Sequence, residues 1–160
     1  MLRITKVTDY GVVIMSRFAQ HPEGSVLTAK DIAQSTQIPF PMVSKILKLL
    51  GRNDLLHSHR GVKGGYGLVR RAGDINLADI ICALEGPIAM TECSDHGHAG
   101  DCRIEDSCRV RVNWQRINGV VRSALARITL AEMADTACAG GSPCAHHAFM
   151  MPGPKESLSV

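Results

Sequence analysis

The sequence lacks the features that mark several broad classes of protein. Its 160 residues contain no run of eighteen or more apolar residues, so no membrane-spanning helix is expected. The first residues contain no apolar stretch that ends in a small-residue cleavage site, which argues against a secretory signal. No nucleophile–base pair or substrate-sized motif is recognisable, so we do not expect an enzyme. These absences favour a cytoplasmic protein with no membrane partner, in a reducing compartment where clustered cysteines more often bind metal or do redox chemistry than form disulfides.

Positive charge is concentrated in the first half of the chain. Residues 1–71 hold eleven Lys and Arg against four Asp and Glu, whereas residues 72–160 hold seven against eleven. The net charge of +3 is therefore the difference between a basic half and an acidic half. A basic half favours a polyanionic partner, most simply nucleic acid. A solvated basic surface with no partner would have the same asymmetry, so the charge alone leaves both interpretations open.

Apolar residues at helical spacing predict three helices in the basic half. The first runs through TDYGVVIMSRFAQ, with Thr8 or Asp9 as its N-cap, and ends at the Pro and Gly of HPEG. The second begins at Thr28, three residues before Asp31, in an acidic form of the capping box. The third runs through PMVSKILKLLGRNDLL, behind two prolines that suit a helix entrance. Only STQIP separates the second helix from the third, which is typical of a helix-turn-helix.

Two short extended runs then surround the glycine-rich sequence RGVKGG. Leu55–His59 and Tyr66–Val69 predict the strands of a hairpin, and Gly61, Gly64 and Gly65 permit the positive φ values that its loop needs. A phosphate-binding loop is the alternative, but the segment lacks the Gly-Lys-Ser/Thr ending and no helix follows it. We therefore expect a β-hairpin.

Three helices and a basic hairpin predict a mainly α fold with a small β-hairpin wing, that is, a winged helix-turn-helix DNA-binding domain over residues 1–86. The third helix would enter the major groove of an operator in duplex DNA, and the wing would contact phosphates or the minor groove. Arg70 and Arg71, just beyond the hairpin, would add to its positive charge. The residues predicted to contact DNA are Ser44, Lys45 and Lys48 on the third helix and Arg60, Gly61, Lys63, Gly64, Gly65 and Tyr66 in the wing.

The acidic half is expected to contain a short helix, a loop and a long helix. INLADIICALEG predicts the short helix, with Cys82 buried as a small hydrophobe. From about Glu105, a helix of some twenty residues has more apolar surface than one short neighbour can cover. Pairing with the same helix of a second chain would cover it and give a homodimer, whereas packing wholly on its own domain is the alternative. The apolar stripe consists of Val110, Trp114, Ile117, Val121, Leu125 and Ile128, and we expect Trp114 at the dimer interface.

A full capping box at Thr129 and Glu132 predicts a last short helix. We assign residues 87–108 to a cysteine-bearing loop and residues 109–137 to the dimerisation helix and this closing helix. Residues 138–160 are Gly-, Pro- and Ser-rich, so a disordered tail is expected. The tail contains enough potential ligands for a metal site: Cys138, Cys144, His146 and His147.

Three of the six cysteines lie in ECSDHGHAGDCRIEDSC, where we expect Cys108 in the first turn of the long helix. Eight residues separate Cys93 from Cys102, and five separate Cys102 from Cys108. Structural zinc usually uses pairs two to four residues apart, and this stretch has none. Three thiolates on a Gly-rich loop suit an iron–sulfur cluster whose fourth ligand comes from elsewhere. A zinc site, a redox thiol and a disulfide-stapled loop remain alternatives.

Several segments, in order, resemble the IscR-type iron–sulfur transcription regulators. They are LRITKVTDYGV, RGVKGGYGL, ADIICALEG, the three cysteines and RITLAEM, and together they extend from residue 1 to about residue 135. EGPIAMTEC and VNWQRIN are most similar to the branch that regulates the Suf cluster-assembly operon. The resemblance implies a winged-helix homodimer that binds a [2Fe-2S] or [4Fe-4S] cluster, the former favoured, through Cys93, Cys102 and Cys108. Cluster occupancy would then change operator affinity, so that the protein reports on cluster supply, iron, oxygen or nitric oxide.

The sequence departs from this pattern at the fourth ligand. Assembly regulators of this type have a histidine three residues after the last cysteine, where this chain has Arg111. A guanidinium stays protonated and cannot ligate iron. Relatives that sense nitric oxide use an aspartate from the other subunit, which Asp9 matches; His96 or His98 is the alternative, followed by solvent or a small thiol. The alternative function is a winged-helix regulator that senses redox state or metal through zinc or reversible thiol oxidation, without a cluster.

Overall fold

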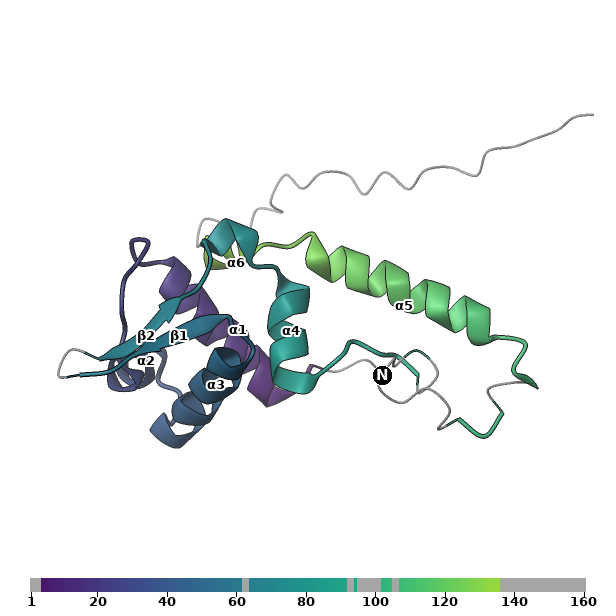
Figure 1. Cartoon of the computed structure of the whole chain (residues 1–160), viewed down its shortest axis with the longest axis horizontal. Helices are drawn as coiled ribbons and strands as arrows, with labels where there is room; N and C mark the ends of the chain where they lie inside the picture. Colours follow the sequence, from purple (N-terminus) through teal and green to yellow (C-terminus); the bar gives the residue numbers. More distant parts are fainter. Residues whose placement is uncertain (1–3, 62–63, 92–93, 95–101, 105–106, 136–160) are drawn as a thin grey trace, which may run out of the picture.

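The computed structural model describes residues 4–61, 64–91, 94, 102–104 and 107–135. The chain is mainly helical with one two-stranded antiparallel hairpin, so the predicted fold class is confirmed (Figure 1). Within the described part, no helix is long and apolar enough to cross a membrane. The elements are α1 (Lys6–Ala19), α2 (Ala29–Thr36), α3 (Phe40–Arg52), β1 (Leu56–His59), β2 (Gly65–Leu68), the 3-10 turn η1 (Ala72–Asp74), α4 (Leu77–Glu85), α5 (Arg111–Ala126) and α6 (Leu130–Ala134).

The N-cap of α1 is Thr5, so the prediction of Thr8 or Asp9 was wrong. The Thr5 hydroxyl accepts a hydrogen bond from Thr8 N–H and donates one to Glu85 at the end of α4. That second partner lies 80 residues away in the sequence, where no local pattern could indicate it. At its other end α1 stops at Ala19, before the proline and glycine that mark the loop.

The helix-turn-helix is confirmed. Thr28 and Asp31 form the predicted capping box of α2, with the Thr28 hydroxyl accepting from Asp31 N–H at 3.1 Å. Gln37 ends α2 in the left-handed region at φ 58°, which turns the chain sharply into α3. Pro39 is the N-cap of α3, where its missing N–H has no structural cost.

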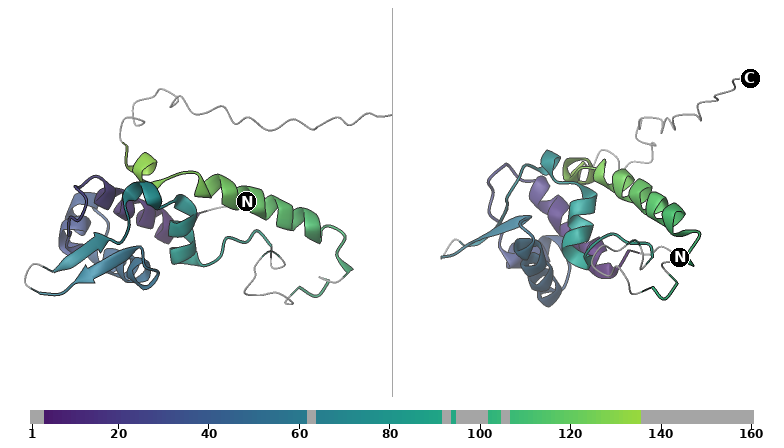
Figure 2. Two further views of the ribbon diagram at one scale, coloured as in Figure 1. Left: turned by 45° about the horizontal axis from the view of Figure 1, so that its top comes forward. Right: turned by 45° about the vertical axis from the view of Figure 1, so that its right-hand side comes forward.

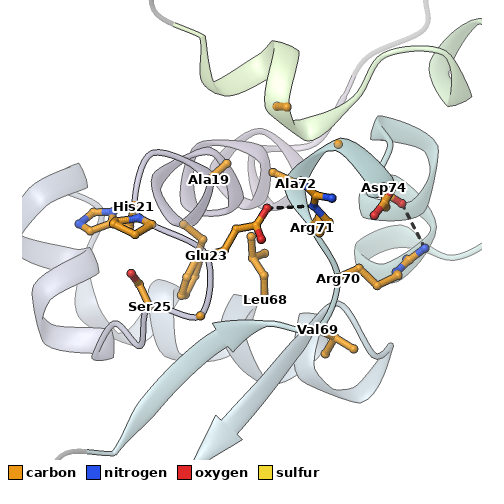
Figure 3. A pocket seen from close by; sticks show the side chains of 15 residues that line it. Ala19, His21, Glu23, Ser25, Leu68, Val69, Arg70, Arg71, Ala72 and Asp74 are labelled. Atoms are coloured by element: carbon orange, nitrogen blue, oxygen red, sulfur yellow. Dashed lines mark hydrogen bonds and ion pairs between the residues drawn. The ribbon is translucent and has the colours of Figure 1, made fainter.

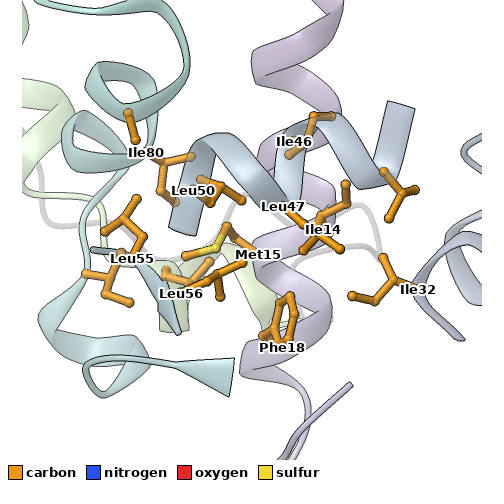
Figure 4. Close-up of a cluster of buried hydrophobic side chains, with 14 of the residues drawn as sticks. Ile14, Met15, Phe18, Ile32, Ile46, Leu47, Leu50, Leu55, Leu56 and Ile80 are labelled. Carbon is orange, nitrogen blue, oxygen red and sulfur yellow. The ribbon is translucent and has the colours of Figure 1, made fainter. Parts of the chain in front are cut away.

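One hydrophobic core lies between α1, α3, α4 and the hairpin (Figure 4). The inner face of α3 is fully buried, because its apolar side chains recur every three or four residues. Burial of each such side chain stabilises the fold by about 1.5–3 kcal/mol. The largest fully buried side chains are Ile14, Met15, Ile32, Val43, Ile46, Leu47, Leu50, Leu55, Leu56, Ile75, Ile80 and Leu130.

The hairpin pairs β1 with β2 from Leu56–Leu68 to His59–Gly65, within one residue of the predicted strands. Leu27 adds a bridge to Tyr66, with backbone hydrogen bonds of 2.9 and 2.8 Å. Gly61 has the expected positive φ, at 118°. The same expectation for Gly64 and Gly65 was wrong, because these glycines are needed for close packing. A Cβ on Gly64 would lie 2.6 Å from His59 O, and one on Gly65 would lie 2.6 Å from Leu27 O.

The end of the described chain returns to the core. Thr129 and Glu132 form the predicted capping box of α6, which packs against α1. Leu77 N–H donates to Ile128 O at 2.9 Å, and Leu130 N–H donates to Ile75 O at 2.8 Å. α6 and the start of α4 are thereby joined by backbone hydrogen bonds.

α5 projects from this core as a separate rod, with its last turns near α4 and its first turns farthest away (Figures 1 and 2). It has 16 residues and begins at Arg111, later than the predicted start near Glu105. Two tight turns precede it, in which Ser107 N–H donates to Ile104 O and Arg111 N–H donates to Cys108 O. Cys108 therefore precedes α5, and its predicted place in the first helical turn was wrong. The tail predicted from residue 138 lies outside the described residues.

Candidate DNA-binding surface and cysteine-bearing connection

The outward face of α3 has a pair of cations. Lys45 and Lys48 are exposed, one turn apart, on the side of the helix opposite the buried apolar residues. Ser44 lies beside them and is half-buried. Phe40, at the first turn of the same helix, is 53% exposed. This helix can present both positive charge and hydrogen-bond donors to a groove of duplex DNA.

The wing lies next to α3, against which β1 packs. Arg60 and Gly61 are exposed at its end, Gly64 and Gly65 are half-buried, and Lys63 lies outside the described residues. Tyr66 is anchored by both of its backbone hydrogen bonds to Leu27, and its side chain packs on the core. Among the predicted wing contacts that the structure describes, Arg60 is the charged one, and it is exposed.

Two histidines of β1 belong to this surface and were missed. His57 and His59 are exposed, and their ring centroids lie 4.4 Å apart in an edge-to-face contact. The run LHSHR, in which one buried leucine is followed by four exposed polar residues, was the available signal. The two rings add hydrogen-bonding groups to the strand that leads to Arg60.

Arg70 and Arg71 are engaged with carboxylates and do not extend the wing as free cations. The Arg71 guanidinium lies 2.9 Å from Glu23, across an open cavity between the loop after α1 and the segment after β2 (Figure 3). Arg70 lies 3.2 Å from Asp79 and donates to Asp74 O at 3.3 Å. These contacts join segments at the base of the hairpin.

Asp9 lies on the exposed side of α1, beside a groove between α1, α2 and α6. The groove also has two apolar side chains on its rim, Val13 at 43% exposed and Met133 at 41%. Because Thr5 caps the helix, capping does not account for an aspartate at position 9. Its carboxylate is accessible to a group outside this chain.

The cysteine-bearing connection runs from α4 to α5. Cys102 and Cys108 are half-buried free thiols in the part of it that the structure describes. The other predicted ligands of this stretch, Cys93, His96 and His98, lie outside the described residues. Two unpaired thiols on short turns are suited to binding a soft metal centre, so the donor chemistry fits an iron–sulfur cluster. Cys82, predicted to be buried, is half-exposed in a groove between α4 and α5.

Glu85 joins the end of α4 to the start of α1 through hydrogen bonds. Its carboxylate accepts hydrogen bonds from the Thr8 hydroxyl, from the Thr5 hydroxyl at 2.8 Å and from Thr5 N–H at 3.3 Å. The Thr8 hydrogen bond, with help from those of Thr5, holds the pKa of Glu85 below its ordinary value, although partial burial acts in the opposite direction. The helix that leads into the cysteine-bearing connection is thus fixed to the helix that carries Asp9.

α5 has more apolar surface than its own domain covers. Val112 is 72% exposed, Val120 57% and Ile117 43%, and Trp114 is 36% exposed. An apolar groove on this side of the helix is lined by Asn113, Arg116, Ile117, Val120 and Val121. The structure describes all of α5, and Asn118 is its one buried residue. The sequence analysis missed Asn118 because a polar residue was not expected on the inner face of the helix. The side of α5 that carries Ile117 and Val120 is open to a partner.

Comparison with known proteins agrees with this architecture. The profile of Rrf2, described as an iron-dependent transcriptional regulator, matches residues 4–136. The chain is 30% identical over 132 residues to the HTH-type transcriptional regulator IscR of Xenorhabdus nematophila, covering 82% of this chain and 79% of that one. It is similar to the structure of CymR, the global cysteine regulator of B. subtilis, with 30% identity, a TM-score of 0.64, and 84% and 97% of the two chains covered. It is also similar to T. potens IscR, with 28% identity, a TM-score of 0.62, and 89% and 93% covered.

Proposed function

The chain belongs to the Rrf2 family of DNA-binding transcriptional regulators, and from this premise we propose that an iron–sulfur cluster controls its affinity for an operator. The family and the winged-helix fold make it a transcription regulator and not an enzyme. The observation that supports the cluster most directly is the pair of free thiols, Cys102 and Cys108, on the connection between α4 and α5.

DNA would be bound by α3 and the wing together. Ser44, Lys45 and Lys48 are assigned to the major groove, because the inner face of α3 is buried and this face is open. Arg60 and Lys63 are assigned to the phosphate backbone. The wing glycines and Tyr66 shape the hairpin, with Gly61 at a positive φ and the backbone of Tyr66 bonded to Leu27.

The cluster would be held by Cys93, Cys102 and Cys108, with [2Fe-2S] favoured over [4Fe-4S]. When bound, it supplies a centre that is sensitive to iron, oxygen and nitric oxide. The chain's own part is to present thiolates from a short connection, so that ligation draws residues 93–108 together next to the start of α5. Arg111, at that start, stays protonated and cannot be the fourth ligand.

Asp9 is assigned as the fourth ligand, supplied by the partner subunit, with His96 or His98 as the alternative. Its carboxylate is exposed and α1 is capped by Thr5, so ligation would cost the helix no cap. A second subunit would be held by the exposed apolar side of α5, which carries Ile117 and Val120. The protein would then act as a homodimer with two DNA-binding heads.

The target genes are assigned to the Suf cluster-assembly type. EGPIAMTEC and VNWQRIN carry that assignment, since both are most similar to this branch of the IscR-type regulators. A regulator that responds to cluster occupancy is suited to control of cluster assembly, because its own cofactor is the product.

A second candidate function uses the same thiols without a cluster. A winged-helix regulator that responds to thiol oxidation or to zinc would use Cys102 and Cys108 as its sensing groups. Both cysteines are free thiols with part of their surface exposed, so an oxidant could reach them.

Anaerobic purification separates the two candidates. We expect a coloured protein with iron and sulfide in equal amounts, and loss of both in Cys102→Ala and Cys108→Ala. Cys82→Ala is the matched control, since it removes a half-exposed thiol elsewhere and should keep the full iron and sulfide content. A colourless protein with stoichiometric zinc after anaerobic reconstitution would rule the cluster out.

A further inference from the structure

α5 is fastened to the first residues of the cysteine-bearing connection by one polar side chain. Of Arg111–Ala126, all of which the structure describes, only Asn118 is buried, with 6% of its surface exposed. Its Oδ1 accepts a hydrogen bond from Met90 N–H at 3.2 Å, and its Nδ2 donates one to Ile88 O at 3.0 Å. Both ends of the amide are therefore bonded to backbone groups that flank a single residue.

This contact requires a side-chain amide. Ile88 O and Met90 N–H are spaced like the groups that a neighbouring strand engages in an antiparallel ladder, and Asn118 supplies the matching donor and acceptor. An aspartate of the same shape lacks the donor, and an alanine lacks both groups. Ile88 and Met90 are half-buried, so their backbone groups would lose partners that water replaces only in part, and the contact of residues 88–90 with α5 would weaken if position 118 could not bond both groups.

We call the two hydrogen bonds from Asn118 to Ile88 and Met90 the Asn118 clamp. The segment that it holds, residues 88–90, lies between α4 and the cysteines. Met90 precedes Cys93 by three residues, and Asn118 is adjacent to Ile117 on the exposed apolar side of α5. At its other end the segment follows Glu85, which is bonded to α1. Movement of the cysteine-bearing connection can therefore reach α5 through this clamp.

On the basis of the proposed function, we propose that Asn118 is a positioning residue that couples cluster occupancy to the position of α5. It holds the chain that enters the cluster ligands at one place on α5. Formation or loss of the cluster then displaces α5, and with it the second subunit, instead of only rearranging the loop. Without the clamp, the cluster and the DNA-binding heads respond independently.

The clamp itself is tested in the cluster-free protein by amide hydrogen exchange. In Asn118→Asp, exchange at Met90 should become at least about fivefold faster, because its acceptor is no longer held by the bond to Ile88. Gln115→Glu is the matched control, since it makes the same change of charge and shape at an exposed position of the same helix. Asn118→Ala tests the contact without added charge, and far-UV circular dichroism checks that each variant keeps its helices.

The coupling is tested on a DNA duplex selected in vitro by the cluster-bound wild-type protein. The ratio of operator affinities with and without cluster should fall toward one in both Asn118 variants, while the affinity of the cluster-free form stays within about twofold. Gln115→Glu should keep the wild-type ratio. A merely structural role would lower the affinities of both forms together and leave their ratio unchanged.

Three results would overturn the proposal. Unchanged exchange at Met90 in both Asn118 variants would show that the clamp is absent in solution. Faster exchange with an unchanged affinity ratio would show that the clamp exists but does not couple. A wild-type protein that binds no cluster would remove both the coupling and the proposed function, while the exchange result would still stand for the clamp.

Discussion

At the scale of single residues, we expect accessible charge on the wing to decide which of its side chains contribute to DNA binding. Arg60 is exposed at the end of β1, whereas Arg71 is paired with Glu23. A phosphate contact gives affinity without sequence preference and makes binding depend on salt. The wing is therefore expected to affect all DNA sequences equally.

Arg60→Ala should weaken binding to specific and non-specific duplexes by the same factor. It should also reduce the slope of log affinity against log salt by about 1, because one phosphate contact is lost. Titrations at several salt concentrations measure both quantities. Arg127→Ala, which removes an exposed charge at the end of α5, should change neither. An unaltered salt slope in Arg60→Ala would remove Arg60 from the DNA-binding surface.

Glu85 makes stability depend on pH through its hydrogen bonds to α1. Its pKa in the folded protein lies below the value of about 4.3 for an unfolded glutamate, so its contribution is fully present above that value and is lost as the pH falls through the folded pKa. A double-mutant cycle of Thr8→Val and Glu85→Gln measures what the charge of Glu85 adds to its hydrogen bond with Thr8. The coupling in free energy of unfolding should be favourable at pH 7 and smaller at pH 3. An equal coupling at both pH values would show that the carboxylate is not the group involved.

At the scale of elements, the sequence predicts what is determined locally. The capping boxes of α2 and α6 were found because both partners lie within four residues, and α3 was found because its apolar spacing is regular. The cap of α1 was missed because Glu85 comes from a distant helix. Gly65 was given the wrong role because the backbone that approaches it, at Leu27, belongs to a distant segment, whereas Gly64 is approached by His59 and Gly61 of its own hairpin. Nothing local indicates that Asn118 faces residues 88–90.

α5 has an exposed apolar surface that a second subunit would cover. Ile117→Glu places a carboxylate on the apolar side of the helix, and burying it at an interface would cost several kcal/mol for each of two subunits. We expect sedimentation to show a monomer with much weaker operator binding. Gln115→Glu adds the same charge elsewhere on α5 and should remain dimeric. If Ile117→Glu also stays dimeric, the two subunits associate through another surface.

At the scale of the whole molecule, the cysteine-bearing connection lies between the DNA-binding elements and α5. α1 to α4 form one core, and α4 is linked to α1 through Glu85 and to α5 through the segment held by Asn118. Two half-sites on DNA require a fixed separation of about 34–36 Å between heads. A change at the cysteines can therefore alter affinity without altering the DNA-binding surface.

The proposed control of operator affinity by the cluster is tested most directly by comparing that affinity with and without cluster at one salt concentration. Anaerobic binding assays should give values for the wild-type protein that differ by about 5- to 150-fold, the usual range for coupled sites. Cys102→Ala should have the cluster-free affinity under both conditions, whereas Cys82→Ala should behave as wild type. Equal wild-type affinities for cluster-loaded and cluster-free protein would contradict the account.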